Sequence, residues 1–151
     1  MNRITTERSL VKYILLSIIT CGIYGLYFTY ALARDINEMC AEDGQQTPGL
    51  LTFFLLSIVT CGIYSYYWHY CVANRIQANA NGQFDLNVTE NGTTILLWLI
   101  IGSFICFVAS FVAYQIIIKN TNALAIAYNE KLDASNNAIY ESETESETTE
   151  E

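Results

Sequence analysis

The side chains that could take part in acid–base or metal chemistry are few in this chain of 151 residues. There is one histidine, His69, and the three longest apolar stretches contain no aspartate or glutamate. Catalysis in such surroundings needs buried acids, a histidine cluster or a metal site. Two interpretations of His69 stay open: a polar ring at a membrane interface, or a contact for a proton or ligand. The sequence predicts no enzyme activity, no catalytic residue and no cofactor.

The cysteines do not indicate a metal site or a disulfide framework. Their number is odd, and no two of them have the CxxC spacing that is typical of zinc and redox sites. We expect them to be small buried hydrophobic residues. They are Cys21, Cys40, Cys61, Cys71 and Cys106.

His69 and most of the cysteines lie in three apolar stretches, 10–33, 50–73 and 94–118. A helix crosses a hydrocarbon core of ~30 Å with about 20 apolar residues, so each stretch is long enough to span a membrane. The sequence therefore predicts an all-α integral membrane protein with three hydrophobic segments.

The predicted organisation has three parts: a short basic amino end (1–9), one membrane domain (10–134) and an acidic disordered tail (135–151). Six glutamates lie after Tyr140, and like charge with low hydrophobicity predicts disorder. The membrane domain is expected to contain a first repeat (10–44), a second repeat (50–82) and a third span (94–118) with a helical extension to 134.

The first two segments are copies of one another. Residues 14–37 align with 54–77 at a shift of 40 without a gap, and 13 of the 24 pairs are identical. The shared sequence is LLSI-x-TCGIY-x-x-Y-[FW]-x-Y. The candidate motif residues are Thr20, Gly22, Tyr24, Tyr27 and Phe28 in the first copy, and Thr60, Gly62, Tyr64, Tyr67 and Trp68 in the second.

Thr20 and Thr60 lie about ten residues into their stretches, at a depth of ~15 Å, near the middle of a bilayer. The glycine two residues later weakens a helix by about 1 kcal/mol. A threonine hydroxyl bonded to the carbonyl four residues earlier bends a helix further. We therefore expect Gly-broken helices, with a kink or break after each threonine. The aromatic residues that follow are expected near the lipid headgroups.

Two shapes fit this pattern. In the first, each copy is one kinked span that ends in an aromatic belt. In the second, a half-depth helix turns at the glycine and an aromatic helix returns to the side of entry. Lysine and arginine are nearly balanced across the membrane in the first shape, so charge does not separate the two. We expect three crossings with a cytoplasmic amino end.

The TCGIY copies and the end of the third stretch together resemble the bacterial membrane protein family DUF4234, a domain of unknown function. The resemblance covers residues 10–125. The stretch from Thr60 to Trp68 has the family's Thr-x-Gly-Ile-Tyr element and aromatic pair, and the first copy differs by Phe28. Gln115 and Asn122 correspond to its closing element at altered spacing. The resemblance implies a multi-pass protein of the bacterial cytoplasmic membrane with no assigned activity.

Two functions stay open. The first is a non-enzymatic scaffold or accessory protein whose glycines let helices pack closely. Its expected partners are membrane lipids, a second copy of the chain or another membrane protein, and no nucleic acid. The alternative is an oligomeric transporter or channel for a small solute or ion. Its site would be lined by Thr20, Gly22, Thr60 and Gly62. The sequence favours the first function because no stretch carries a carboxylate that could couple transport.

Overall fold

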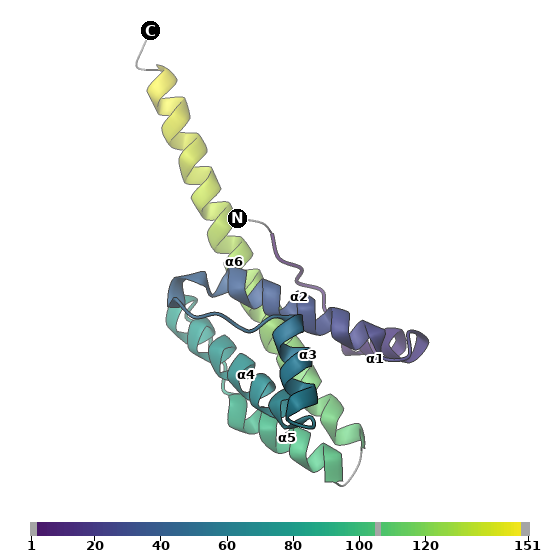
Figure 1. Cartoon of the computed structure of the whole chain (residues 1–151). Coiled ribbons are helices and arrows are strands. Elements are labelled where there is room, and N and C mark those ends of the chain that lie inside the picture. The colour runs from purple at the N-terminus through teal and green to yellow at the C-terminus, as the bar shows by residue number, and fades with distance from the viewer. Residues whose placement is uncertain (1–2, 105–106, 149–151) are drawn as a thin grey trace.

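The structure is a computed structural model that describes residues 3–104 and 107–148. Its helices pair into three hairpins, and the longest helix projects beyond the others (Figure 1). The described residues are all-helical, as expected. The elements are α1 (Leu10–Ile19), α2 (Ile23–Met39), the 3-10 turn η1 (Ala41–Asp43), α3 (Leu50–Val59), α4 (Ile63–Gln83), α5 (Gly92–Phe104) and α6 (Phe107–Thr148).

No helix in the described part of the chain is both long enough and apolar enough to cross a membrane. The prediction of an integral membrane fold with three spans is therefore wrong. Stretches 10–33 and 50–73 are each divided by a turn, and α1 and α3 have ten residues each. Ten residues extend ~15 Å, about half of what a span requires. The third stretch, 94–118, is divided between α5 and α6.

Helix α6 continues to Thr148. It therefore includes residues 135–148, for which the sequence predicts a disordered tail, and residues 149–151 lie outside the described part. Glutamate is a good helix former, so an acidic composition alone does not end a helix. The end of α6 extends away from the remaining helices in Figure 1.

The core lies between α2, α4 and α6, which contribute most of its buried residues. Burial follows the same spacing in all three helices, at an offset of 40 from α2 to α4 and of 45 from α4 to α6. The third hairpin therefore packs as another copy of the same unit, although it lacks the TCGIY sequence. The equivalent buried residues are Trp68, Val72, Ala73 and Ile76 in α4, and Ala113, Ile117, Ile118 and Thr121 in α6.

Three non-helical segments, 3–9, 44–49 and 84–91, precede the hairpins. Asparagine side chains hold them in place. Asn37 accepts the N–H of Thr47 at 2.7 Å and donates to its carbonyl at 3.0 Å. Asn81 binds both backbone groups of Val88 at 2.8 and 3.0 Å. Each amide side chain satisfies one backbone donor and one backbone acceptor of the segment, as a neighbouring strand does in a β-sheet.

Gly92 begins α5 at a point where the backbone lies against α4. A Cβ atom at this position would lie 2.3 Å from the carbonyl oxygen of Tyr70 and 2.7 Å from Nδ2 of Asn74. The Oδ1 atom of Asn74 accepts the N–H of Gly92 at 2.8 Å. A side chain at residue 92 would therefore push α5 away from α4.

We expect Gly92→Ala to lower the free energy of unfolding by about 1–3 kcal/mol, since a backbone carbonyl cannot move aside as a flexible side chain can. Chemical denaturation followed by circular dichroism measures the change. The matched control is Gly82→Ala in α4, where a Cβ would meet no atom within 4 Å and alanine favours the helix. Equal losses in the two variants would contradict the close approach of α5 to α4.

Candidate functional site

The TCGIY sequence forms the turn between α1 and α2. Cys21 and Gly22, which follow Thr20, adopt left-handed conformations with φ angles of 50° and 90°. The N–H of Gly22 donates to the carbonyl of Ser17 at 2.7 Å, and that of Cys21 to the carbonyl of Ile18 at 3.2 Å. These two bonds are the Schellman pattern that ends a helix. The chain therefore reverses here and does not continue as one span.

The hydroxyl of Thr20 connects the two helices of the hairpin. Its Oγ1 atom donates to the carbonyl of Leu16 at 2.6 Å and accepts the N–H of the half-buried Tyr24 at 2.9 Å. It thus caps the first turn of α2, where N–H groups have no partner within the helix. The predicted bond to the carbonyl four residues earlier and the predicted break are both confirmed.

The second hairpin repeats this geometry. Thr60 donates to the carbonyl of Leu56 at 2.7 Å and accepts the N–H of Tyr64, also half-buried, at 2.9 Å. The N–H of Gly62 donates to the carbonyl of Ser57 at 2.7 Å. The shared sequence is therefore a turn motif. Both copies have the hairpin shape, and the expectation of three crossings is not met.

Gly22 and Gly62 serve the turns and not the packing between helices. A Cβ atom at either glycine would meet no other atom within 4 Å, so the expected close helix packing does not occur there. Their φ angles of 90° and 89° are costly for any residue with a side chain, which explains the glycines. Together with Thr20 and Thr60, these glycines form the turns of two separate hairpins.

Apolar residues on either side of each turn form two surfaces that we name the hairpin tips. Neither α1 nor α3 contains a buried residue. A contiguous exposed apolar surface marks a place of interaction with another molecule or with lipid. The tips consist of Ile18, Ile19 and Ile23, which are 70%, 75% and 68% exposed, and of Ile58, Val59 and Ile63, which are 61%, 78% and 71% exposed.

The aromatic residues of the motif separate into two groups. Phe28 and Trp68 are buried, and Nε1 of Trp68 donates to the carbonyl of Pro48 at 2.9 Å. Tyr27 and Tyr67 are exposed. Neighbouring positions on a helix face different directions, so one of each pair points to the core. The expectation that the whole aromatic set lies near lipid headgroups is therefore wrong for Phe28 and Trp68.

His69 is buried in the core. Its Nδ1 atom lies 2.7 Å from the carbonyl oxygen of Ser65. The ring centroids of Phe53, Trp68 and Tyr114 lie 6.3, 5.1 and 5.5 Å from the imidazole centroid. Burial lowers the pKa of His69, which favours the neutral ring donating from Nδ1. The interpretation of His69 as a polar ring at an interface is therefore wrong.

The two residues predicted to form the closing element of the third segment, Gln115 and Asn122, lie in different surroundings. Gln115 is exposed on α6, whereas Asn122 holds the amino-terminal segment. Asn122 accepts the N–H of Arg8 at 3.2 Å and donates to its carbonyl at 2.8 Å. Asn129 binds both backbone groups of Ile4 at 2.9 Å. Sequence reasoning missed Asn129, although two asparagines seven residues apart lie on one helix face and could have indicated it.

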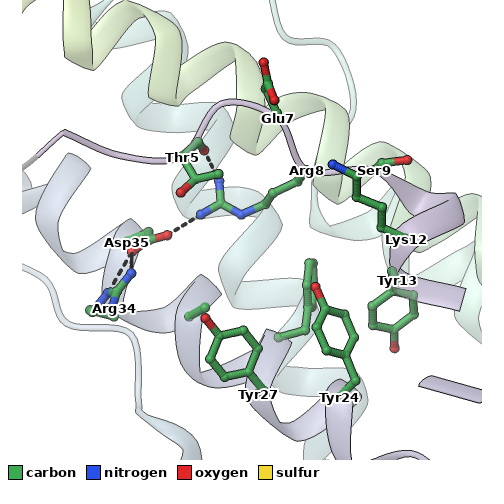
Figure 2. Close-up of a pocket in the computed structure, with 12 residues that line it drawn as sticks. Thr5, Glu7, Arg8, Ser9, Lys12, Tyr13, Tyr24, Tyr27, Arg34 and Asp35 are labelled. Carbon is green, nitrogen blue, oxygen red and sulfur yellow. Dashed lines mark hydrogen bonds and ion pairs between the residues drawn. The ribbon is translucent and has the colours of Figure 1, made fainter. Parts of the chain in front are cut away.

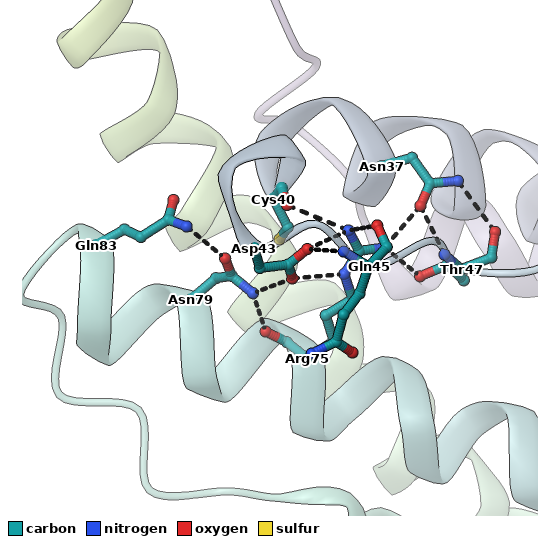
Figure 3. A network of polar contacts seen from close by, with 8 residues as sticks. All are labelled: Asn37, Cys40, Asp43, Gln45, Thr47, Arg75, Asn79 and Gln83. Atoms are coloured by element: carbon teal, nitrogen blue, oxygen red, sulfur yellow. Dashed lines mark hydrogen bonds and ion pairs between the residues drawn. The ribbon is translucent and has the colours of Figure 1, made fainter.

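Arg75 of α4 lies at the centre of a polar network (Figure 3). Its Nε and Nη2 atoms donate to the two carboxylate oxygens of Asp43 at 2.8 and 2.9 Å. It also donates to Oγ1 of Thr47 at 2.9 Å and to the carbonyl of Gln45 at 2.6 Å. Asn79 donates to Asp43 at 2.8 Å. The network thereby fixes η1 and the segment before α3 to helix α4.

At the position equivalent to Arg75, the first hairpin has the buried carboxylate of Asp35. The guanidinium of Arg8 binds one of its oxygens, and Nε of Arg34 donates to the other at 2.9 Å (Figure 2). Arg8 also donates to the carbonyl of Thr5 at 2.8 Å. Sequence reasoning missed both buried charges. The signal was a charged residue at the same position of each copy, within the helix that follows the motif.

Within the described ranges, no three His, Cys, Asp or Glu side chains gather so that they could hold a metal ion. Cys40 is buried, and burial raises its pKa to about 12. Cys21 and Cys61 are exposed and Cys71 is half-buried. The expectation of buried cysteines is thus met by Cys40 alone among these four, and Cys106 lies outside the described residues.

We expect Thr20→Val and Thr60→Val each to lower the free energy of unfolding by about 1–2 kcal/mol. The N–H of Tyr24 or Tyr64 loses its acceptor while the side-chain volume hardly changes. Chemical denaturation of the full chain measures the loss. The serine variants at both positions keep the hydroxyl and are the matched controls. A loss as large in the serine variants would show that the hydroxyl does not cap α2 and α4.

The Arg75 guanidinium lowers the pKa of Asp43 from 3.8 to about 2. The lowered folded-state pKa means that the stabilisation is present above pH 3.8 and is lost as the pH falls towards 2. We expect Asp43→Asn to lower stability at neutral pH and to flatten the decline of the free energy of unfolding between these pH values. Glu42→Gln, which changes an exposed neighbouring carboxylate, is the control. An unchanged pH slope in Asp43→Asn would rule out this role.

The family described as domain of unknown function DUF4234 matches twice, over residues 8–78 and over residues 48–122. The second match begins one hairpin after the first, which agrees with three copies of one unit. No curated protein and no solved structure matches the chain. The matches cover most of the chain and confirm the family predicted from the TCGIY copies, while a bacterial origin stays a prediction. The chain belongs to the DUF4234 family.

Proposed function

We propose that this protein is a non-enzymatic structural or interaction protein held at one face of a lipid bilayer by its two hairpin tips. The tips enter one leaflet and do not cross the membrane. The observation that carries the proposal is that α1 and α3, apolar helices of ten residues each, contain no buried residue. Apolar surface that the protein itself leaves uncovered gains free energy when lipid covers it.

The length of the hairpins agrees with insertion to half depth. A ten-residue helix such as α1 extends ~15 Å, which is half of a hydrocarbon core of ~30 Å. The turn at Thr20 then lies near the middle of the bilayer, and α2 returns to the side of entry. The second hairpin has the same dimensions, because α3 also has ten residues.

The backbone of each tip suits surroundings without water. In the first turn the N–H groups of Thr20, Cys21, Gly22 and Ile23 all donate to nearby carbonyls. The N–H of Tyr24 donates to the threonine hydroxyl. An unpaired N–H in hydrocarbon costs several kcal/mol. A tip that has satisfied these donors internally avoids that cost.

The side chains near the tips agree with the same placement. Residues 50–73 carry no charged side chain, and residues 10–33 carry only Lys12. Each buried isoleucine or valine is worth roughly 1.5–3 kcal/mol, so the six tip residues provide a substantial driving force.

Cysteine labelling tests the proposal directly, because Cys21 and Cys61 are exposed at the two turns. In variants that keep one of these cysteines alone, we expect vesicle binding to protect the thiol from a membrane-impermeant maleimide. Single cysteines introduced at Gln46, Asn87 and Asn137, all exposed, should stay reactive from the same outer side. Rapid labelling of both turns on bound vesicles would contradict insertion.

A second test of the proposal introduces charged side chains at the tips. A charged side chain near the bilayer centre costs at least about 2.5 kcal/mol, so Ile19→Glu combined with Val59→Glu should reduce co-flotation with vesicles more than a hundredfold. The matched control is Ile126→Glu, an exposed isoleucine on α6 away from both tips. Equal losses in the tip and control variants would show that the tips are not the inserted surface.

A further inference from the structure

A pocket at the base of the first hairpin lies between the amino-terminal segment and α2 (Figure 2). Its cavity of about 170 Å³ is lined by three cationic side chains, Arg8, Lys12 and Arg34, and by Tyr24 and Tyr27. Both tyrosine hydroxyls point towards the guanidinium of Arg8 in Figure 2. A cavity of ~150 Å³ holds a molecule the size of benzene, so the pocket has room for a phosphate group.

We infer that this pocket binds a phosphate group, and that the group is the phosphodiester of a lipid in the leaflet that the first tip enters. The assignment of the phosphate to a lipid rests on the proposed function. The assignment of the ligand as a phosphate rests on the pocket alone.

The charge balance of the pocket supports an anionic ligand. Two guanidinium groups, of Arg8 and Arg34, share the single buried carboxylate of Asp35. Lys12 adds a third positive charge, while the remaining acid, Glu7, directs its carboxylate away from Arg8 in Figure 2. These three cations and two anions give the pocket a net charge of about +1. Guanidinium and ammonium groups with hydroxyl donors are the groups that recognise phosphate in proteins.

The second hairpin provides an internal comparison. There one guanidinium, Arg75, faces one carboxylate, Asp43, and its donors are occupied by protein acceptors. In the first hairpin two arginines, Arg8 and Arg34, contact the one carboxylate of Asp35. In the described part of the chain, the guanidinium of Arg8 donates to that carboxylate and to one backbone carbonyl. Burial lowers the pKa of Arg8 despite the opposing effect of Asp35. An anion in the pocket would stabilise this partly compensated cation.

The height of the pocket above the tip fits a lipid phosphate. Lys12 precedes Thr20 by eight residues, which is ~12 Å along α1. Arg34 follows Ile23 by eleven residues, which is ~16 Å along α2. If the tip reaches the bilayer midplane, these cations lie ~12–16 Å from it, at the edge of the ~30 Å hydrocarbon core where headgroups begin.

Protection of Lys12 from an amine-acylating reagent, measured by mass spectrometry, tests the inference on the full chain in a phosphate-free maltoside detergent. The probes are inorganic phosphate, glycerol phosphate and short-chain phosphatidylglycerol. We expect phosphatidylglycerol to protect Lys12 at a concentration at least tenfold below that of either soluble phosphate. Lys119, also exposed and located on α6, is the internal reference and should stay reactive.

Arg34→Gln should weaken this protection about fivefold, the value of one cation near a lipid surface. Arg3→Gln, which removes an exposed arginine outside the pocket, should leave it unchanged. Protection by soluble phosphate at equal concentration would overturn the lipid source and keep the phosphate site. No protection by any probe would overturn the site itself. Labelling of the turn cysteines reports separately on insertion, so the proposed function and this pocket can fail independently.

Discussion

The fold depends on one kind of contact, in which a threonine hydroxyl bonds to both helices of a hairpin, and two hairpins have it. Thr20 and Thr60 each bond backwards to the last turn of one helix and forwards to the first turn of the next. Two left-handed residues after each threonine reverse the chain. Without this closure, a stretch such as 10–33 has the length and composition of a single apolar helix. With it, the stretch becomes a short helix and a returning one, and apolar side chains end up at a turn.

Polar contacts at the other end of the hairpins complement these turns. Asp35 and Arg75 occupy equivalent positions on α2 and α4, and each binds the non-helical segment that precedes its own hairpin. Asparagine side chains bind the same segments from a neighbouring hairpin. A buried charge that loses its partner costs about 3–5 kcal/mol, so these contacts specify how the units join.

Part of this architecture could be predicted from the sequence. The repeat, the break after Thr20 and Thr60 and the family follow from residue identity and from the preference of a threonine hydroxyl for a nearby carbonyl. The reversal was one of two shapes that the sequence left open, and the expected shape, three crossings, was wrong. Hydropathy counts side chains and cannot choose between the shapes, whereas the left-handed conformation of Cys21 and Gly22 decides the direction of the chain. The third unit was missed because it lacks the TCGIY sequence and shares only a pattern of burial.

The candidate site could likewise be predicted only in part, because contacts between distant parts of the chain form it. The exposure of Tyr27 could be predicted from its amphipathic ring, but the burial of Phe28 next to it depends on which face of α2 meets the core. The pocket near Arg8 depends on a contact between the amino-terminal segment and α2 that lie far apart in the sequence. No local pattern of charge indicates that two arginines meet one carboxylate.

Asn122 bonds to Arg8 and Asn129 to Ile4, which joins parts of the chain that are separated by 114 and 125 positions. During synthesis, residues 3–9 leave the ribosome well before α6 exists to receive them. The contacts that hold the amino-terminal segment on α6 can therefore form only after the chain has been translated beyond Asn129. Contacts between such distant residues slow folding because a long loop must close first.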